Sequence, residues 1–289
     1  MEQIIKIAFQ GEPGAYSEAA LLEHFGPLSN SLPCPSFDEV FESVNSGTAD
    51  YGLVPIENSL AGSIHRNYDL LLQNNLFVIG EHFLPVRHCL IGFPGVEIHQ
   101  LKKVISHPQA LAQCEASIKR LKLVSEAVYD TAGSVKILQQ SQDHTMAAIA
   151  SSRAANIYKM SILLENIEDN SANITRFLVI HSKPITADPE KAESFKTSIV
   201  FALNNIPGAL FKALSVFALR DIDLTKIESR PLAGKPWEYF FYVDFAGSSE
   251  LDHCRRALDH LQEYATFFRI LGSYPRSKFP GIHKMIDQK

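Results

Sequence analysis

A hydroxyl, an amide and a guanidinium stand side by side in one short run of the chain. Asn173, Thr175 and Arg176 belong to the sequence Asn-Ile-Thr-Arg-Phe, which has almost no other charge around it. A positioned hydroxyl can donate to a departing oxygen, and a guanidinium fork can bind a carboxylate. Taken alone, the run is better explained as the start of the apolar strand that continues through residues 177–180.

Two further polar clusters favour a chemical role, because each follows a short apolar run. The first comes after residues 51–56 and the second after residues 104–105. Their members are Glu57, Asn58 and Ser59 in the first cluster, and Ser106, His107, Pro108, Gln109 and Ala110 in the second. Open α/β sheets bind ligands at strand ends. Glu57 is equally well explained as a surface carboxylate, and His107 as a capping or core histidine.

Composition limits the class of protein. The chain has 289 residues, of which 46% are hydrophobic and 20% charged, which predicts a globular protein with room for two domains. Its net charge is -5 and it has no block of Lys or Arg. We therefore expect neither nucleic acid nor a membrane as a partner, and an anionic ligand has to be held by local groups.

The cysteines and the N-terminus bear on the compartment. Cys34, Cys89, Cys114 and Cys254 are scattered without the spacing of a disulfide framework or a zinc site, so no metal is expected. The chain runs directly into the apolar residues 4–9, without the features of a secretory signal. These observations predict a cytoplasmic protein with reduced thiols.

The order of apolar runs and helix-period segments predicts an α/β fold with a largely parallel sheet. We expect two lobes with a cleft between them, then a Pro- and charge-rich linker, then a βαββαβ module of ferredoxin-like type. The predicted boundaries are 1–182 for the first domain (lobe one about 1–84 and 165–182, lobe two about 85–164), 183–196 for the linker, 197–275 for the module and 276–289 for a polar tail.

Several predicted helices begin beside these polar clusters. Pro108 suits the first helical position after a cap at His107 or Ser106, and Thr131 and Ser151 mark two more helix starts. The unpaired N–H groups of a helix start bind anions. Each cap taken singly is ordinary, and only their clustering at strand ends indicates a carboxylate site.

Six motifs together resemble those of prephenate dehydratases, in the same order and over nearly the whole chain. They are Gly-Ala-Tyr-Ser-Glu (14–18), Pro-Ile-Glu-Asn-Ser (55–59), Ser-His-Pro-Gln-Ala (106–110), Asn-Ile-Thr-Arg-Phe (173–177), Gly-Ala-Leu (208–210) and Glu-Ser-Arg-Pro (228–231). The resemblance implies a bilobal, type II periplasmic-binding-protein-like catalytic domain and a C-terminal ACT regulatory domain. It implies a hydro-lyase of L-phenylalanine biosynthesis that dehydrates and decarboxylates prephenate to phenylpyruvate without a cofactor.

Two stretches of the chain bear on the choice of substrate and on how well the motifs agree with those of the family. Residues 62–72 look more like the plant arogenate dehydratase branch, so arogenate, which would give L-phenylalanine directly, is an alternative substrate. Thr131 stands in Asp-Thr-Ala-Gly-Ser, which departs from the commoner Ser-Thr-Ala-x-Ala form of the family.

The resemblance also implies roles for single residues. Thr175 is the catalytic residue, which donates to the leaving oxygen. The residues implied to bind substrate are Asn58, Ser59, Ser106, Gln109, Ala110, Thr131, Asn173, Arg176 and Phe177, with Glu57 and His107 as possible support. An inhibitory L-phenylalanine is expected at a subunit interface of a homodimer or homotetramer, bound by Gly208, Ala209, Leu210, Glu228, Ser229 and Arg230.

Three rival interpretations remain at this stage. A non-catalytic solute-binding or sensor protein could have the same bilobal fold. A transcriptional regulator with an ACT domain is disfavoured, since the sequence has no basic helix-turn-helix candidate. The C-terminal module could also serve only for dimerisation, because the edges of ferredoxin-like sheets pair readily.

Overall fold

The structure is a computed structural model, and it describes residues 5–186, 188–232 and 234–278. The described chain divides into two compact units. The first contains the described residues up to 67 together with 82–177, and the second contains 68–81 together with 178–278. The boundary between them crosses β5 (Phe77–Pro85) and β11 (Ile174–His181).

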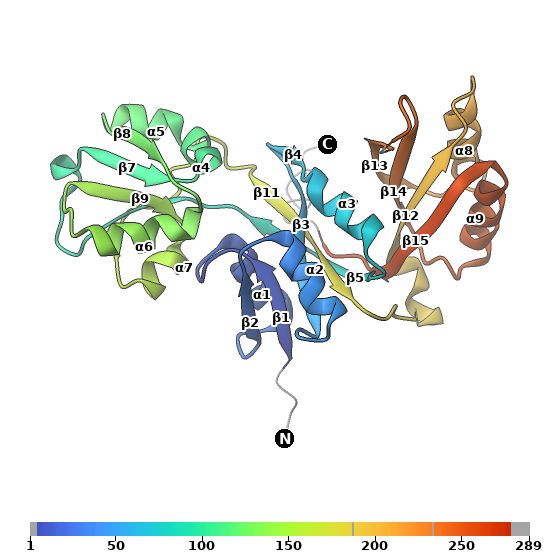
Figure 1. The fold of residues 1–289 in the computed structure, drawn as a ribbon, viewed down its shortest axis with the longest axis horizontal. Coiled ribbons are helices and arrows are strands. Elements are labelled where there is room, and N and C mark those ends of the chain that lie inside the picture. Colours follow the sequence, from blue (N-terminus) through green and yellow to red (C-terminus); the bar gives the residue numbers. More distant parts are fainter. Residues whose placement is uncertain (1–4, 187, 233, 279–289) are drawn as a thin grey trace, which may run out of the picture. The chain divides into compact units, whose positions relative to one another are not determined.

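The first sheet has the strand order β2-β1-β3-β11-β5, with β4 paired to β3 (Figure 1). Its remaining elements are β1 (Lys6–Gln10), α1 (Tyr16–Phe25), β2 (Asn30–Cys34), α2 (Phe37–Asn45), β3 (Tyr51–Asn58), β4 (Gly62–Ser63) and α3 (His65–Gln73). β1 is parallel to both β2 and β3. Ile7, Ala8 and Phe9 are fully buried, which explains why β1 reads as a continuous apolar run.

The second sheet belongs to lobe two and has the order β10-β6-β9-β7-β8. Its elements are β6 (Cys89–Gly92), η1 (Ile98–Gln100), β7 (Lys103–Ser106), α4 (Pro108–Gln113), α5 (Glu115–Arg120), β8 (Val124–Ala127), α6 (Thr131–Ser141), β9 (Met146–Ala150), α7 (Ser152–Ile157) and β10 (Ser161–Leu164). β7 is parallel to β8 and β9, whereas β6 is antiparallel to β9 and β10. The expectation of a largely parallel sheet therefore holds for only part of this lobe.

The C-terminal elements form the predicted βαββαβ module. They are η2 (Pro189–Ser194), β12 (Phe195–Leu203), α8 (Ala209–Ala218), β13 (Leu224–Pro231), β14 (Tyr239–Ala246), α9 (Asp252–Tyr264) and β15 (Ala265–Pro275), and the sheet order is β13-β14-β12-β15. Apolar side chains of α8 and α9 pack with those of β12 and β14 in one core, so both helices cover the same face of this sheet (Figure 1). The predicted α/β fold class, with two lobes and a C-terminal sheet domain, is confirmed.

The second unit also contains the chain segment 68–81, which packs on the C-terminal sheet. Lys196 donates to both oxygens of Glu81 at 2.9 and 2.7 Å, and both side chains are buried. Arg269 donates to the carbonyls of Leu71, Leu72 and Leu76 at and after the end of α3, where carbonyls lack helical partners.

Gly272 shows how close this packing is, because a Cβ at this position would lie 1.9 Å from the carbonyl oxygen of Val78. The first strand of the module begins at Phe195 rather than Thr197, so the last residues of the predicted linker are buried. Arg276 donates to the Ser194 carbonyl, and the tail beyond Lys278 lies outside the described residues. The exact domain boundaries stay a prediction.

Candidate active site

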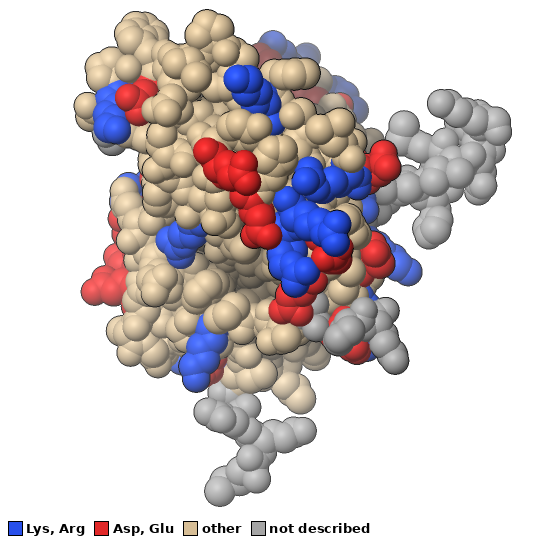
Figure 2. All heavy atoms as spheres, turned by 90° about the vertical axis from the view of Figure 1, so that its right-hand side faces the viewer, with Lys and Arg blue, Asp and Glu red and all other residues tan. Residues whose placement is uncertain are grey.

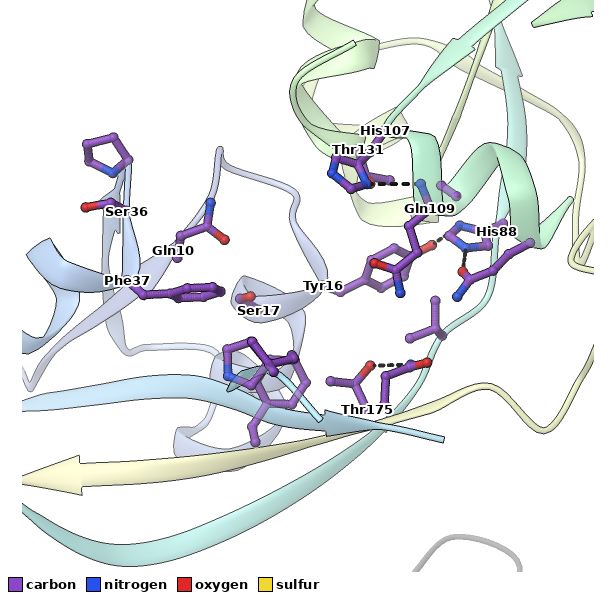
Figure 3. A pocket seen from close by; sticks show the side chains of 18 of the residues that line it. Gln10, Tyr16, Ser17, Ser36, Phe37, His88, His107, Gln109, Thr131 and Thr175 are labelled. Carbon is purple, nitrogen blue, oxygen red and sulfur yellow. Dashed lines mark hydrogen bonds between the residues drawn. The ribbon is translucent and has the colours of Figure 1, made fainter. Parts of the chain in front are cut away.

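A cavity of about 590 Å³ lies in the first unit, with walls from both lobes (Figure 3). It is lined by Gln10, Tyr16, Ser17, Pro35, Ser36, Phe37, Asp38, Pro55, Asn58, Ile64, Val86, His88, His107, Gln109, Ala110, Gln113, Thr131, Thr175 and Phe177. Apolar and polar groups are mixed along its walls, as in sites for small organic ligands.

Four helix starts contribute to the lining. Tyr16 opens α1, Phe37 opens α2 after the cap Ser36, and Thr131 opens α6. On α4, the His107 side chain accepts from the Gln109 N–H at 3.2 Å, and Pro108 occupies the first helical position, as predicted. The N-terminal turns of these helices all border one cavity, so their partial positive charges act on the same ligand.

Thr175 lies in this cavity and is bonded to Asn58. Asn58 Nδ2 donates to Thr175 Oγ1 at 3.0 Å and to Asn173 Oδ1 at 2.7 Å. Its Oδ1 accepts the backbone N–H groups of Leu60 and Ala61, which fixes the orientation of the amide. Because Asn58 can only donate toward Thr175, the threonine oxygen accepts and its own proton is available to a ligand.

Asn173 adds a buried amide to this group. Its side chain is fully buried, and its Nδ2 group has no hydrogen-bond partner among the described residues. A buried donor without a partner is costly unless a ligand or water satisfies it. The Asn58, Thr175 and Asn173 side chains therefore form one network that has an unused donor.

Seven residues of the predicted site line the cavity: Asn58, His107, Gln109, Ala110, Thr131, Thr175 and Phe177. Among them, Phe177 supplies an apolar wall.

The other five predicted site residues, Glu57, Ser59, Ser106, Asn173 and Arg176, are not part of the cavity lining. Ser106 is buried and donates to the Ile149 carbonyl at 2.6 Å. Ser59 donates to the Ala172 carbonyl and accepts from the Ile174 N–H, so it ties β3 to the start of β11. Glu57 and Arg176 also lie outside the lining, although Arg176 is buried next to Thr175 in the chain.

Several lining residues were not predicted from the sequence: Gln10, Tyr16, Ser17, Ser36, Phe37, Asp38, Val86, His88 and Gln113. Tyr16 and Ser17 stand in the first of the six motifs, so the signal for them was present. His88 and Gln113 have no such signal. They reach the cavity only because the crossover between the lobes folds against α4.

Asp38 brings the one carboxylate among the described lining residues. Arg66 pairs with it from the start of α3. The hydrogen bond from this guanidinium lowers the pKa of Asp38 below its ordinary value. The carboxylate therefore stays ionised at neutral pH. It is a negative charge in the lining of a cavity that is also bordered by the positive ends of helices.

A smaller cavity of about 280 Å³ lies on the C-terminal module. Gly208, Ala209 and Leu210, at the start of α8, are part of its lining, together with Trp237 and other residues. Glu228, Ser229 and Arg230 lie elsewhere, on the edge strand β13, and do not line it. Within one chain, the two halves of the predicted effector site are therefore separate.

Fold and cavity define a bilobal α/β protein with a C-terminal ferredoxin-like module. The family model described as prephenate dehydratase matches residues 7–185. Over 280 residues the chain is 51% identical to arogenate dehydratase/prephenate dehydratase 2, chloroplastic, of Arabidopsis thaliana, covering 94% of this chain and 73% of that protein. The chain belongs to the prephenate dehydratase family, as the motifs predicted, and is a dehydratase.

Two solved structures are similar over almost the whole chain. Prephenate dehydratase in complex with L-Phe, from Arthrobacter aurescens, is 32% identical with a TM-score of 0.86, covering 94% of this chain and 90% of that one. The structure described as GqqA, a novel type of quorum quenching acylase, is 38% identical with a TM-score of 0.89, covering 95% and 99%.

The predicted cytoplasmic location is wrong. Relatives from Arabidopsis thaliana are described as chloroplastic, which contradicts that prediction. The four buried cysteines do not distinguish the two compartments, since reduced thiols fit any compartment that is not oxidising. In the part of the chain that the structure describes, no helix is long and apolar enough to span a bilayer.

Proposed function

We propose that the cavity binds prephenate or arogenate and that Thr175 assists departure of the ring hydroxyl. The observation that carries this proposal is the fixed Asn58 amide, which makes Thr175 Oγ1 an acceptor and directs its proton to a ligand. As the bond from the ring to its carboxylate breaks, CO₂ leaves and the electron pair enters the ring. The hydroxyl leaves from the opposite ring carbon and takes up a proton to become water.

The cavity suits a substrate of this charge. Both candidate substrates carry two carboxylates, and helix N-termini bind such groups without a basic patch. The starts of α1, α2, α4 and α6 all contribute lining residues. The ring carboxylate that is lost should be held weakly, because strong binding of the ground state opposes decarboxylation. Aromatisation supplies the driving force, so the residues have to position the substrate and help the hydroxyl to leave.

Arogenate is the second candidate substrate, and Asp38 favours it. Arogenate has an ammonium group where prephenate has a keto group, and an ionised carboxylate at the cavity wall can pair with that ammonium. The relatives described as arogenate dehydratases support the same choice. Purified protein mixed separately with each substrate distinguishes them, because prephenate gives phenylpyruvate and arogenate gives phenylalanine. Loss of both activities in Thr175→Ala would link turnover to this cavity.

An acylase function has less support from the site. Acylases of the serine and cysteine types use a nucleophile bonded to a base. The cavity histidines have other contacts: His88 bonds to Tyr16 and Gln113, and Nδ1 of His107 accepts the Gln109 N–H. Incubation of the protein with an acylated homoserine lactone tests for acylase activity. No release of fatty acid is expected.

We further propose that L-phenylalanine binds the C-terminal module and inhibits turnover. The cavity beside Gly208, Ala209 and Leu210 lies at the start of α8, which suits the carboxylate of an amino acid. The relative from Arthrobacter aurescens was solved in complex with L-Phe. Calorimetry with L-phenylalanine, combined with kinetics at saturating effector, tests this. No binding and unchanged kinetics would leave only a dimerisation role.

A second copy of the chain is expected to complete the effector site. Phe211 and Trp237 both belong to the lining and are 78% and 77% exposed. Glu228, Ser229 and Arg230 lie on an edge strand, which can be placed against another copy.

On the face of the molecule seen in Figure 2, acidic and basic side chains are interspersed between uncharged areas. Sedimentation with and without L-phenylalanine would show whether the protein is a dimer or a tetramer.

A further inference from the structure

The turn between β1 and α1 brings two polar side chains to the cavity. Gln10 is the last residue of β1, and Ser17 lies in the first turn of α1. Both line the cavity from its lobe-one side (Figure 3). Among the described residues, neither side chain has a hydrogen-bond partner. The end of a strand and the start of the next helix form the edge where open α/β sheets bind ligands.

Ser17 is the more confined of these two side chains, because it is only 9% exposed. Its hydroxyl faces the cavity (Figure 3). A buried hydroxyl without a partner costs free energy unless a ligand or a water molecule satisfies it. The proton of this hydroxyl is therefore available to a ligand in the cavity.

The backbone beside Ser17 offers further donors. Ala15 precedes α1 and has no side-chain oxygen that could cap the helix. The N–H groups of Tyr16, Ser17 and Glu18 have no partner among the described contacts. At the other three helix starts on the cavity, a side chain accepts one N–H of the first turn, and these caps are Ser36, His107 and Asp130. The start of α1 therefore keeps its N–H groups for a ligand.

The carboxylate of Glu18 does not occupy this helix start. Its Oε2 accepts from the Gly14 N–H at 2.8 Å and from Arg153 Nε at 2.9 Å. Its Oε1 accepts from the Ser31 hydroxyl at 2.9 Å. Arg153 thus balances the charge of Glu18. An anion at the start of α1 meets unpaired donors and the positive end of the helix dipole.

We propose that the start of α1, with the Ser17 hydroxyl, binds the carboxylate on the side chain of the substrate, which is the carboxylate that the product keeps. This inference rests on the proposed function of the cavity. Several donors on one carboxylate bind it strongly. Strong binding would oppose the loss of the ring carboxylate as CO₂, but it suits a group that stays unchanged through the reaction.

The geometry of the substrate agrees with this assignment. The side chain and the ring hydroxyl are attached to opposite carbons of the ring, so the groups that bind them have to lie at different walls. Figure 3 shows Ser17 and Thr175 apart from each other along the cavity. In arogenate the ammonium group is next to the side-chain carboxylate. Asp38, which is proposed to pair with that ammonium, comes from lobe one, as Ser17 does.

The first test is steady-state kinetics of Ser17→Ala. KM should rise roughly tenfold, because a hydrogen bond to a charged group is lost. The value of kcat should change by less than about twofold, since a retained group is bound equally in the ground state and the transition state. Phenylpyruvate has the side-chain carboxylate and no ring carboxylate, so its competitive inhibition constant should rise by the same factor as KM. Inhibition by benzoate, whose carboxylate is on the ring, should not change.

Ser152→Ala is the matched control, because Ser152 is an exposed serine in the first turn of α7 and does not line the cavity. It should keep the wild-type KM and both inhibition constants. Neither variant should unfold at a lower temperature, since neither hydroxyl has a partner among the described residues. The proposal is overturned if Ser17→Ala keeps the wild-type KM, or if inhibition by benzoate weakens in place of inhibition by phenylpyruvate.

A second test does not require turnover. Calorimetry should show that Ser17→Ala binds phenylpyruvate roughly tenfold more weakly than the wild type does. Equal affinity of the two proteins overturns the inference about Ser17. Failure of the proposed function is a different result, namely no turnover of prephenate or of arogenate by the wild type.

Discussion

Thr175 is the residue whose chemistry depends most on a neighbour. Its oxygen accepts from Asn58, so its proton is directed to the ligand. We predict that Thr175→Ala lowers kcat by about 10²–10⁴-fold with a much smaller effect on KM, because general acid help contributes in the transition state. Thr175→Ser, which keeps the hydroxyl, should retain more activity. Steady-state kinetics measures both, with the exposed Thr48→Ala as the control. If alanine were the better replacement, the residue would act in packing.

Asn58 allows a sharper test of the same hydrogen bond. Asn58→Asp can still accept from the backbone of Leu60 and Ala61, but an ionised carboxylate cannot donate to Thr175. The threonine proton would then turn back to the carboxylate, and we predict a loss in kcat of about 10²-fold at neutral pH. Activity of this variant should recover as the pH falls, since a protonated carboxyl can donate again. A pH-independent loss would contradict this account.

At the scale of elements, the cavity exists because several helices begin beside it. Gly14 shows how closely the two lobes approach there. A Cβ at this position would lie 2.8 Å from Cα of Ala154 on α7. The backbone of Gly14 also has a φ of 93°, which residues other than glycine rarely adopt. Ser151 Oγ donates to the Gly14 carbonyl at 2.7 Å from the start of the same helix. A loop of one lobe is thus fitted to a helix of the other.

The ion pair between Lys196 and Glu81 joins β12 to β5 within the second unit. Both side chains are buried, so removing one partner leaves a buried charge. We predict that Lys196→Met lowers the free energy of unfolding by roughly 3–5 kcal/mol, and that adding Glu81→Gln restores part of this loss. Urea unfolding of both variants measures the effect. Lys191→Met is the control, since Lys191 is exposed. A double variant less stable than the single one would argue against a paired charge.

At the scale of the whole molecule, we expect residues 68–81 to couple the cavity to the C-terminal module. They pack with the C-terminal module, yet Asn58 precedes them in the chain, and Val86 and His88 follow them. We therefore expect any coupling between effector binding and the cavity to run through this segment. Allosteric coupling of this kind typically amounts to about 1–3 kcal/mol.

Truncation tests this connection. We predict that deleting residues from Lys196 onward leaves a protein whose residual activity ignores L-phenylalanine. The truncated chain should also unfold at a lower temperature, because Glu81 loses Lys196 and the carbonyls of α3 lose Arg269. Kinetics with and without effector, together with thermal unfolding, measures both effects. Inhibition that persists in a folded truncated chain would place the effector site in the catalytic lobes.

Metal dependence is the last property at this scale. Among the described residues, no group of three or more His, Cys, Asp or Glu side chains could hold a metal ion. We predict that activity survives exhaustive dialysis against a chelator, since hydroxide departure needs only positioned donors and aromatisation supplies the driving force. A loss of activity that one divalent ion restores would contradict this prediction.

Local patterns in the sequence were sufficient for much of the molecule. Helix starts at Pro108 and Ser151, and the βαββαβ order of the module, follow from capping residues and hydrophobic periodicity, which act over a few neighbouring positions. The motif residues Asn58, Gln109 and Thr175 were expected in the site because their motifs resemble those of prephenate dehydratases, and all three line the cavity. Asn58 ends β3 and Gln109 lies in the first turn of α4, whereas Thr175 lies at the start of β11.

Tertiary structure alone decided which polar side chains line the cavity. Ser106 and Ser59 have the right types and positions, yet their hydroxyls bond to the backbone carbonyls of Ile149 and Ala172, which lie far from them in the sequence. His88 and Gln113 became cavity residues through hydrogen bonds between segments that no local pattern relates. The grouping of residues 68–81 with the C-terminal module depends likewise on contacts such as that of Gly272 with Val78. Propensity and capping are short-range, whereas the partner of a polar group is set by packing between segments far apart in the sequence.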